Sequence, residues 1–415
     1  MNDKFKWDHH SDQPYQLADK SYKKAMKKKH RADIWLLLVT NLFYFPLALI
    51  AAFFIKGKKV KRDKFFGLCV NLDKGDQQQQ LIAELGCQQL QIRLPLADID
   101  NLDKYVAFRE EFAHCEVLIN VLQDRNHIEN HSLLLENTRK IFNAFAGSVA
   151  TFQIGNAINR TKWGFFSVAE YLSFYQQVQQ LRDSEFPDIK LVGPAVIDYE
   201  YHFTIRALFN GYRIKFDKLA ALLYVDRRGA PENTQTGIFD TTRKIDFLYA
   251  LAKLSGKSSD EIIISEANWP LSNTAPWAPT SETECIDEED YANYLLRYYL
   301  LAFASDKVES VYWHQLIASG YGLVDAREGL VKRGAFYVFK TMLAQLQGSC
   351  VVSFRKEGDA HHLICSKADS VIEVLWNSGE QQQSLITEHR VIDKMGEALT
   401  GDIFIGQSPI YLIRD

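Results

Sequence analysis

The sequence lacks the motifs that mark several large classes of protein. Its six cysteines are scattered, with no C-x-x-C spacing and no histidine cluster nearby, which argues against a zinc site and a disulfide scaffold. No G-x-G-x-x-G follows the first strand-like run, so a dinucleotide-binding sheet is disfavoured. The net charge of -4 gives no overall attraction to nucleic acid. We therefore expect no cofactor, no metal ion and no nucleic-acid partner.

A long apolar run near the N-terminus is the first positive feature. Residues 34–55 read IWLLLVTNLFYFPLALIAAFFI, which carries no charge and has about the length that crosses ~30 Å of hydrocarbon as a helix. A polar tail over residues 1–33 precedes it, and no small-residue cleavage site follows before a lysine-rich stretch, so a cleaved signal peptide fits poorly. We predict a retained membrane segment that contacts lipid, anchoring the chain to a bacterial inner membrane.

The orientation of this segment stays open at the level of sequence. Lysines and arginines flank it on both sides, so the positive-inside bias nearly cancels. Asn41 and Pro46 near its middle also suit a bent, re-entrant helix whose ends both lie beside anionic lipid. A straight single span and a re-entrant helix are both compatible with the pattern, and the side on which the rest of the chain lies is not fixed.

After this segment, β-branched and aromatic runs alternate with helical stretches, a pattern typical of a parallel sheet with crossover helices. With 47% hydrophobic residues in 415, the chain is long enough for one large core and a smaller domain. The pattern predicts a (β/α)₈ TIM barrel over residues 65–348. The expected strands are residues 65–72, 89–96, 116–122, 150–157, 190–196, 219–226, 261–268 and 308–315.

The sequence pattern changes after residue 348. Short strand-like runs separated by turns fill residues 349–415, which predicts a small β-rich accessory domain. Because it has no cluster of acids, histidines or serines of its own, we expect it to support the barrel rather than carry chemistry.

Polar residues at the ends of the predicted strands are the candidates for chemistry, since a barrel of this kind places its active site at the carboxyl ends of its strands. Glu266 ends an apolar run, where a carboxylate is costly to bury without a partner. Arg93, ending the second strand, could keep it ionised, which makes Glu266 a plausible nucleophile. A purely structural ion pair between the two is the alternative.

Aromatic residues are dense around the same strand ends. Sugar rings stack their apolar faces on aromatic planes, so together with Asn156 and Glu266 they favour a carbohydrate groove. Taken one at a time, about half of these aromatic residues are better explained as caps on the barrel core. The aromatic residues are Trp163, Tyr199, Tyr201, Tyr224, Trp269, Trp277, Tyr312 and Trp313.

These residues together resemble the glycoside hydrolases of clan A, especially the branch with β-xylosidase and α-iduronidase-like enzymes. Residues 153–159, Q-I-G-N-A-I-N, match in register the fourth-strand pattern E-I-W-N-E-P-N of that clan. There the Asn contacts the sugar 2-hydroxyl and the following Glu is the acid/base. Glu266 in I-S-E-A-N-W resembles the seventh-strand nucleophile, and Arg93 resembles the second-strand arginine.

The resemblance extends over roughly residues 65–415. Residues 193–195, G-P-A, resemble a fifth-strand motif, and residues 401–412 resemble the end of the accessory β domain of these enzymes. The family implies a retaining hydrolase with Glu266 as its catalytic residue and a saccharide or glycolipid as its partner. The saccharide-binding positions that it implies, together with the strand-end candidates, are Arg93, Asn156, Ala157, Asn159, Trp163, Tyr224, Trp269, Trp313 and His314.

Ala157 is the main departure from the family pattern, because it stands at the acid/base position. Loss of general acid/base assistance costs roughly 10²- to 10⁴-fold in rate, so hydrolysis by the ordinary route is in doubt. Asp198, Glu200 and Asp226 follow the fifth and sixth strands and are possible substitutes, although each is better explained as a solvated loop acid. Two hypotheses remain: an enzyme acting on an envelope glycan, and an inactive saccharide-binding protein or scaffold in polysaccharide or lipopolysaccharide biosynthesis.

Overall fold

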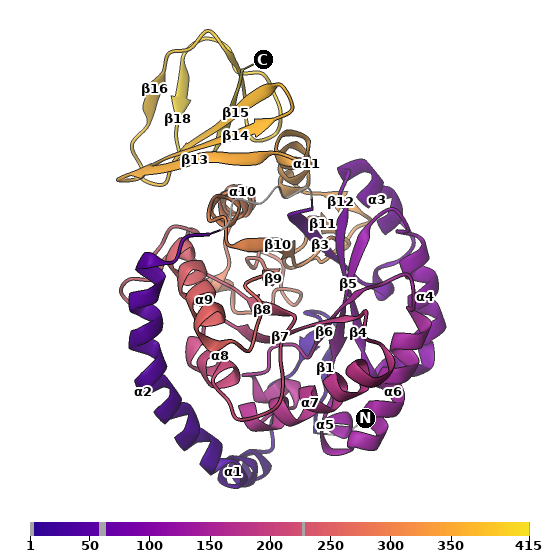
Figure 1. Ribbon diagram of the computed structural model, residues 1–415. Coiled ribbons are helices and arrows are strands. Elements are labelled where there is room, and N and C mark those ends of the chain that lie inside the picture. Colours follow the sequence, from indigo (N-terminus) through magenta and orange to yellow (C-terminus); the bar gives the residue numbers. More distant parts are fainter. Residues whose placement is uncertain (1–3, 58–63, 226–228, 415) are drawn as a thin grey trace.

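The computed structural model describes residues 4–57, 64–225 and 229–414, and its centre is a closed parallel barrel (Figure 1). All eight predicted strands are present, in the order β10-β3-β4-β5-β6-β7-β8-β9 around the barrel. The prediction of a TIM barrel is confirmed. Its strands are β3 (Phe66–Val70), β4 (Gln89–Pro95), β5 (Glu116–Leu122), β6 (Thr151–Ile154), β7 (Lys190–Ile197), β8 (Lys218–Leu222), β9 (Ile262–Ala267) and β10 (Val308–Trp313).

Helices surround the barrel and begin where the sequence supplies capping side chains. Ser167, Asp240 and Asp287 each accept a hydrogen bond from a backbone N–H in the first turn of the helix that follows. The helices are α3 (Gln78–Leu85), α4 (Leu102–Glu110), α5 (Arg125–Glu129), α6 (His131–Ala144), α7 (Val168–Glu185), α8 (Tyr201–Leu208), α9 (Thr241–Ser255), α10 (Glu288–Ala304) and α11 (Gly334–Leu346).

Short elements shape the loops between these helices and strands. A hairpin of β11 (Val324–Asp325) and β12 (Val331–Lys332) lies between β10 and α11. Single 3₁₀ turns follow several strands or precede helices: η1 (Leu72–Lys74), η2 (Leu96–Asn101), η3 (Thr161–Trp163) and η4 (Glu282–Glu284).

The C-terminal strands form extra β sheets beside α10 and α11 (Figure 1). Trp376 is fully buried, and its indole N–H donates to Glu232 Oε1 at 2.9 Å. The same carboxylate accepts from Arg297 Nε of α10 at 2.9 Å, so a buried ion pair joins the sheet to the barrel. The strands are β13 (Cys350–Glu357), β14 (Ala360–Lys367), β15 (Ser370–Asn377), β16 (Gln383–Leu385), β17 (Arg390–Ile392), β18 (Ile403–Ile405) and β19 (Ile410–Arg414).

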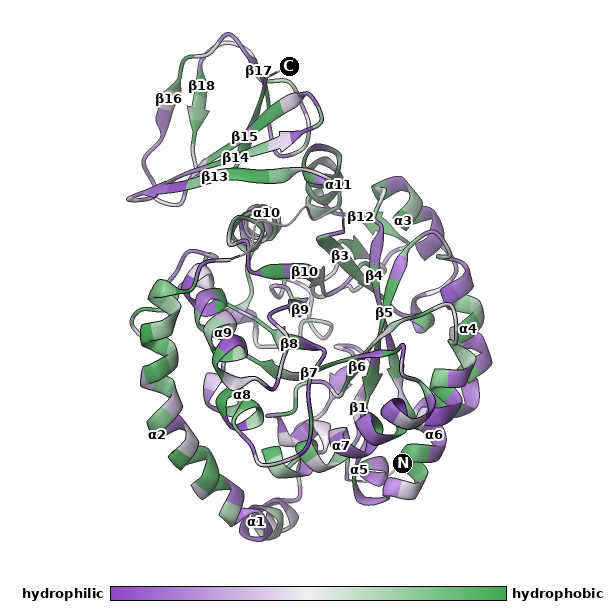
Figure 2. Ribbon diagram, viewed as in Figure 1, coloured by the Kyte–Doolittle hydropathy of each residue, from purple (hydrophilic) through white to green (hydrophobic). Residues whose placement is uncertain are grey.

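The N-terminal part consists of a small hairpin and two helices. The hairpin pairs β1 (Trp7–Asp8) with β2 (Gln13–Pro14). The helix α1 (Lys20–Lys29) follows, and then α2 (Arg31–Phe54), which continues through Pro46 and is strongly apolar (Figure 2). Among the described residues α2 is the one helix long and apolar enough to cross a membrane, by length and composition alone. It lies along α8 and α9 at the side of the barrel (Figure 1).

Candidate functional site

A cavity of about 150 Å³ lies at the carboxyl ends of the barrel strands. Because parallel strands in a closed barrel end at one face, polar residues far apart in the sequence meet there. Six of the sequence candidates line this cavity: Arg93, Asn156, Trp163, Tyr224, Glu266 and His314. The strand-end argument therefore brought together residues that the structure places around one cavity.

Glu266, at the end of β9, is the central acid of the cavity. Its side chain is buried, and Oε1 accepts a hydrogen bond from the Tyr224 hydroxyl at 2.6 Å. Burial raises the pKa of Glu266 above the ordinary 4.5, while the positive charge of Arg93 and the Tyr224 hydroxyl oppose that rise. The arrangement gives a buried carboxyl group that is hydrogen-bonded to Tyr224 and favoured in its charged form by Arg93.

Asn156 follows β6 and is fixed by its neighbours. Its backbone N–H donates to Gln123 Oε1 at 2.8 Å, and its backbone carbonyl accepts from Gln123 Nε2 at 2.8 Å. Its side-chain Oδ1 accepts from Asn120 and from Gln153, each at 3.2 Å. The Asn156 side chain also helps to lower the pKa of the neighbouring Glu266 carboxyl group, so its Nδ2 faces that carboxyl group. Since Oδ1 is engaged, the group that Asn156 can offer to a ligand is an N–H donor.

Aromatic rings enclose Arg93 at the rim of the cavity. The guanidinium lies 5.8 Å from the ring centre of Trp7 and 5.7 Å from that of Trp163. The two tryptophans meet edge to face at 5.7 Å. Trp163 also lines a neighbouring groove of about 760 Å³, together with Trp7, Lys162 and residues 95–99 and 122–127. The site thus combines a small polar cavity with a larger groove that contains aromatic faces.

The N-terminal hairpin lies across the cavity, a contact that sequence analysis missed. Lys74 Nζ is 2.7 Å from Asp12 Oδ2, and Arg93 Nη2 donates to the Asp12 backbone carbonyl at 3.1 Å. Gln315 Nε2 donates to Asp12 Oδ2 at 3.0 Å, and Tyr321 donates to the Ser11 carbonyl at 3.2 Å. Residues 11–13 therefore form part of the cavity wall.

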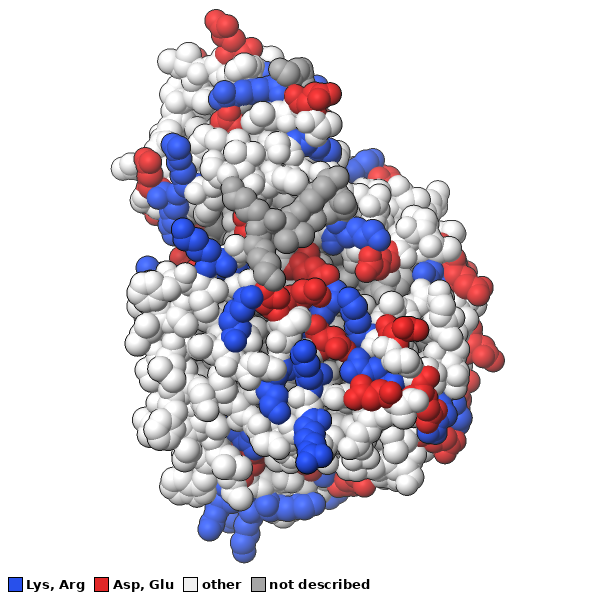
Figure 3. Space-filling view, in the orientation of Figure 1, with Lys and Arg blue, Asp and Glu red and all other residues white. Residues whose placement is uncertain are grey.

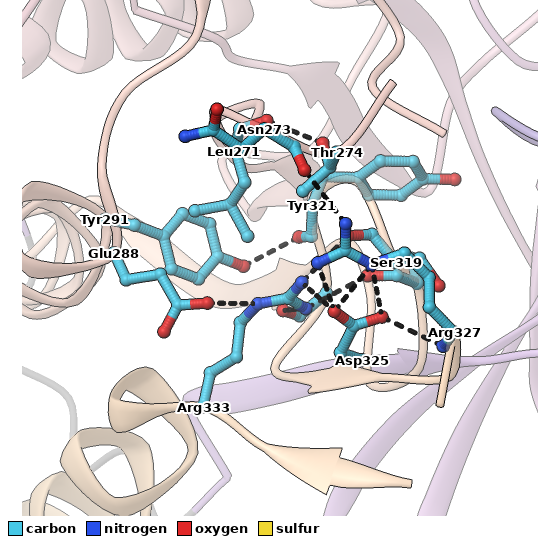
Figure 4. Close-up of polar contacts among 12 residues, drawn as sticks. Leu271, Asn273, Thr274, Glu288, Tyr291, Ser319, Tyr321, Asp325, Arg327 and Arg333 are labelled. Atoms are coloured by element: carbon cyan, nitrogen blue, oxygen red, sulfur yellow. Dashed lines mark hydrogen bonds and ion pairs between the residues drawn. The ribbon is translucent and has the colours of Figure 1, made fainter. Parts of the chain in front are cut away.

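Tyr321 is held in place by a polar network in the loop after β10 (Figure 4). The Tyr321 carbonyl accepts from the Tyr291 hydroxyl at 2.6 Å. Arg333 Nη2 donates to the Ser319 carbonyl and to Asp325 Oδ2, each at 2.9 Å or less. This network fixes the loop that carries one wall of the cavity, and no groups in it face the cavity except Tyr321.

His314 lines the cavity as a neutral imidazole. Burial beside Arg93 holds the pKa of His314 well below its ordinary value of 6.5. Its ring stacks on Tyr321, with the ring centres 5.5 Å apart. Its carbonyl accepts a hydrogen bond from Asn268, another cavity residue. His314 can therefore offer a neutral donor or acceptor to a ligand, but not a positive charge.

Four predicted site residues do not line the cavity. Trp313 is fully buried, its indole N–H donates to the Tyr291 hydroxyl at 2.8 Å, and it stacks on the buried Trp269 at 5.7 Å. Asn159 instead joins two loops, since Oδ1 accepts from the Ile197 N–H and Nδ2 donates to the Ile197 carbonyl, both at 3.0 Å. Ala157 is fully buried at φ 45°. The interpretation of Trp313 as a sugar platform does not fit its position.

Ala157 is not among the residues that line the cavity. It belongs to an apolar cluster with Trp163, against which Trp7 and Tyr224 also pack. Its backbone carbonyl accepts from the Arg160 N–H at 2.9 Å. An alanine at this position supplies no carboxyl group to the cavity.

The possible substitute acids are engaged in ion pairs. Asp198 lines the cavity, and its Oδ2 lies 2.6 Å from Arg160 Nη2. Glu200 Oε1 lies 2.7 Å from Arg160 Nη1 and does not line the cavity. Asp226 falls outside the described residues. Within the described ranges, no group of three or more His, Cys, Asp or Glu side chains is placed to hold a metal ion.

The fold is shared with solved glycoside hydrolases at low sequence identity. A family 39 glycoside hydrolase from Bacteroides cellulosilyticus WH2 superposes with a TM-score of 0.69 and 14% identity, covering 87% of this chain and 83% of the other. A GH39 β-xylosidase from Caulobacter crescentus gives a TM-score of 0.58 at 10% identity, covering 87% and 98%. A GH30 endoxylanase from Clostridium papyrosolvens C71 gives 0.59 at 11%, covering 87% and 97%.

No protein-family model and no curated protein matches the sequence. The structural neighbours nevertheless belong to clan A glycoside hydrolases, the group that the sequence motifs resemble. At these identities the likeness establishes the fold, so the function must be argued from the cavity itself.

Proposed function

We propose that this protein binds an envelope saccharide or glycolipid in the cavity around Glu266, while α2 attaches it to a membrane. The observation that carries the proposal is the meeting of Glu266 and Asn156 in the cavity at the mouth of the barrel, where the Asn156 side chain acts on the Glu266 carboxyl group. A ligand hydroxyl placed beside both can accept a hydrogen bond from Nδ2 and donate one to the carboxylate. Saccharides supply several hydroxyls on a ring whose faces can pack against Trp163.

The acid/base position favours binding over ordinary retaining hydrolysis. That mechanism uses two carboxyl groups about 5 to 5.5 Å apart, one as nucleophile and one as proton donor. Among the residues that the structure describes, the carboxylates that line the cavity besides Glu266 are Asp12 and Asp198. Asp12 is paired with Lys74 and Asp198 with Arg160, so neither is free to protonate a departing oxygen.

A residual glycosidase activity is the second candidate function, and the environment of Glu266 favours it. The carboxyl group is oriented by Tyr224 and acted on by the charge of Arg93, as a nucleophile requires. A nucleophile alone can attack a glycoside whose leaving group departs without protonation. The protein would then form a glycosyl-enzyme intermediate that breaks down slowly for lack of a general base.

Aryl glycosides test this second candidate. We expect dinitrophenyl β-xylosides and β-glucosides, whose leaving groups need no proton, to be cleaved slowly, and the rate to rise with azide, which attacks the glycosyl-enzyme without help from a base. Glu266→Gln should abolish formation of the glycosyl azide of retained configuration, because the glycosyl-enzyme cannot form without the carboxylate. Rapid cleavage of an unactivated disaccharide would show that another residue supplies the proton, and would contradict the binding interpretation.

A further inference from the structure

The helix α2 has one face built to pack against the barrel. Asp33 is buried, and its Oδ1 lies 2.7 Å from Arg206 Nη2 of α8. Asn41 Nδ2 donates to the His202 carbonyl at 2.9 Å. Tyr44 stacks on Phe209 with ring centres 3.7 Å apart. Asp33 and Asn41 thus tie α2 to the barrel, and the helix is an integral part of the barrel flank.

The opposite face of α2 presents a continuous apolar surface. Its large side chains are 46% to 78% exposed. A helix of this length runs about 36 Å at 1.5 Å per residue, and monomeric proteins rarely expose an apolar strip of that extent without a partner. The exposed residues are Ile34, Trp35, Leu36, Leu38, Val39, Leu42, Phe43, Leu47, Ile50, Phe53 and Phe54.

Positive charge gathers at the amino end of this strip. Exposed cations lie on α1 and at the start of α2, while the α2 flank itself carries none (Figure 3). Anionic headgroups attract each such cation by about 1 kcal/mol. An apolar strip that ends in a basic cluster fits the boundary between headgroups and acyl chains of an anionic leaflet. The exposed cations are Lys20, Lys24, Lys27, Lys28, Lys29 and Arg31.

The chain contacts the barrel on both sides of α2. Before α2, Asp12 binds Lys74 and Arg93 at the carboxyl ends of the strands. After α2, Gly57 lies against Asp306, where an added Cβ would come 2.4 Å from the Asp306 carbonyl oxygen. A helix that crosses a bilayer separates its flanking segments by ~30 Å of hydrocarbon. Both flanking segments here bind the same domain, which is incompatible with a single crossing that leaves the barrel in water.

Polar groups beside the middle of α2 also oppose a crossing. A surface groove there is lined by Thr40 and Tyr44 of α2 and by Asn210, Ser255 and Lys257 of the barrel. If α2 crossed the bilayer while packed on this flank, Lys257 would lie at hydrocarbon depth. A lysine near the bilayer centre costs about 2.5 to 3.5 kcal/mol.

The geometry points to a monotopic attachment: α2 lies flat in the interface of one anionic leaflet, and the residues before and after it stay on the same side of the membrane. The barrel then lies on its flank, with α8 and α9 toward the headgroups and the cavity opening sideways along the membrane surface. A lipid-linked saccharide could reach such an opening without leaving the leaflet. This inference rests on the membrane attachment proposed above and is independent of saccharide binding.

Cysteine labelling in sealed membrane vesicles tests the topology with the full chain. The partly exposed Cys285 and Cys350 are replaced by serine, and single cysteines are introduced by Ala18→Cys before α2 and by Glu388→Cys in the exposed loop between β16 and β17. A membrane-impermeant maleimide should label both positions from the same side. Labelling from opposite sides would overturn the inference. Absence of the wild-type chain from the membrane fraction would overturn both the inference and the proposed membrane attachment.

Vesicle binding by the purified protein tests the lipid chemistry. Partition onto vesicles of phosphatidylcholine with phosphatidylglycerol should exceed partition onto phosphatidylcholine alone by about tenfold or more. The L38E/L42E/F53E variant should lose that binding, because it places charges on the strip without touching the barrel-facing side. Equal binding by this variant would overturn the inference, as would self-association of the wild type in place of vesicle binding.

For the basic cluster, K24Q/K27Q/K28Q should weaken binding, and the matched control K104Q/K190Q/K356Q should not.

Discussion

Replacing Arg93 with methionine should lower the free energy of unfolding by about 1 to 3 kcal/mol at neutral pH, because it removes the positive charge that acts on the buried Glu266 and a buried hydrogen bond to a backbone carbonyl. Arg93 is 5% exposed, and its charge opposes the rise in the pKa of the buried Glu266. Without that charge, Glu266 either ionises alone in a poorly solvated cavity or takes up a proton. The variant also loses the hydrogen bond to the Asp12 carbonyl, which holds the N-terminal hairpin.

The pH dependence separates the electrostatic part of this loss from the rest. A carboxyl group whose pKa is raised by folding costs no stability below its unfolded pKa, here the ordinary 4.5, and the cost grows as the pH rises toward the folded pKa. The destabilisation by Arg93→Met should therefore be smaller at pH 4 than at pH 7 in chemical denaturation. In a Glu266→Gln background most of the difference should vanish. A loss of equal size at both pH values and in both backgrounds would show that Arg93 acts only through packing.

Trp313→Ala should lower the free energy of unfolding by about 3 to 5 kcal/mol, the range expected for emptying a fully buried tryptophan site. Trp313 is 0% exposed, and its removal also leaves the Tyr291 hydroxyl without the indole donor. Trp163→Ala, at the rim of the cavity, should cost less stability but weaken saccharide binding. Denaturation and binding measured on both variants decide between the two roles. A stable Trp313→Ala protein that binds no saccharide would restore the sugar-platform interpretation.

The barrel was predictable because its signal repeats along the chain. Every strand reads as a short β-branched or aromatic run, and each run is followed by a helical stretch, so eight repeats specify one topology. The carboxyl ends of those strands then had to meet. For that reason Glu266, Arg93 and Asn156 were placed together without any knowledge of side-chain direction.

Side-chain direction at the strand ends was not predictable. Neighbouring residues of a strand point to opposite sides, and an irregularity in pairing changes which residue faces the cavity. The register between β9 and β10 shifts between Val311 and Trp313. Trp313 packs outward among the helices in the same cluster as Val311, whereas Tyr312 belongs to the inner cluster and His314 lines the cavity. The left-handed backbone of Ala157 has a similar effect at the end of β6.

The N-terminal contacts could not be predicted from local sequence. Residues 7–14 carry no hydrophobic periodicity, and their position is set by partners far along the chain, such as Gln315 and Tyr321 for Asp12 and its neighbour. Composition predicted that α2 is apolar. It did not predict that Asp33 and Asn41 lie on the face of α2 that packs against the barrel. Such long-range pairing is a property of the folded barrel and appears only once the barrel is built.

Calorimetric titration of the full chain with a saccharide panel tests the central claim most directly. We expect at least one saccharide to bind saturably. Asn156→Ala should weaken its affinity by about tenfold, because the ligand loses one hydrogen bond at a buried position; a tenfold change corresponds to ~1.4 kcal/mol of binding free energy. The matched control Asn233→Ala, at an exposed position that does not line the cavity, should bind as the wild type does. A saccharide that bound wild type and Asn156→Ala equally, or a panel in which none bound, would contradict a saccharide site at Glu266.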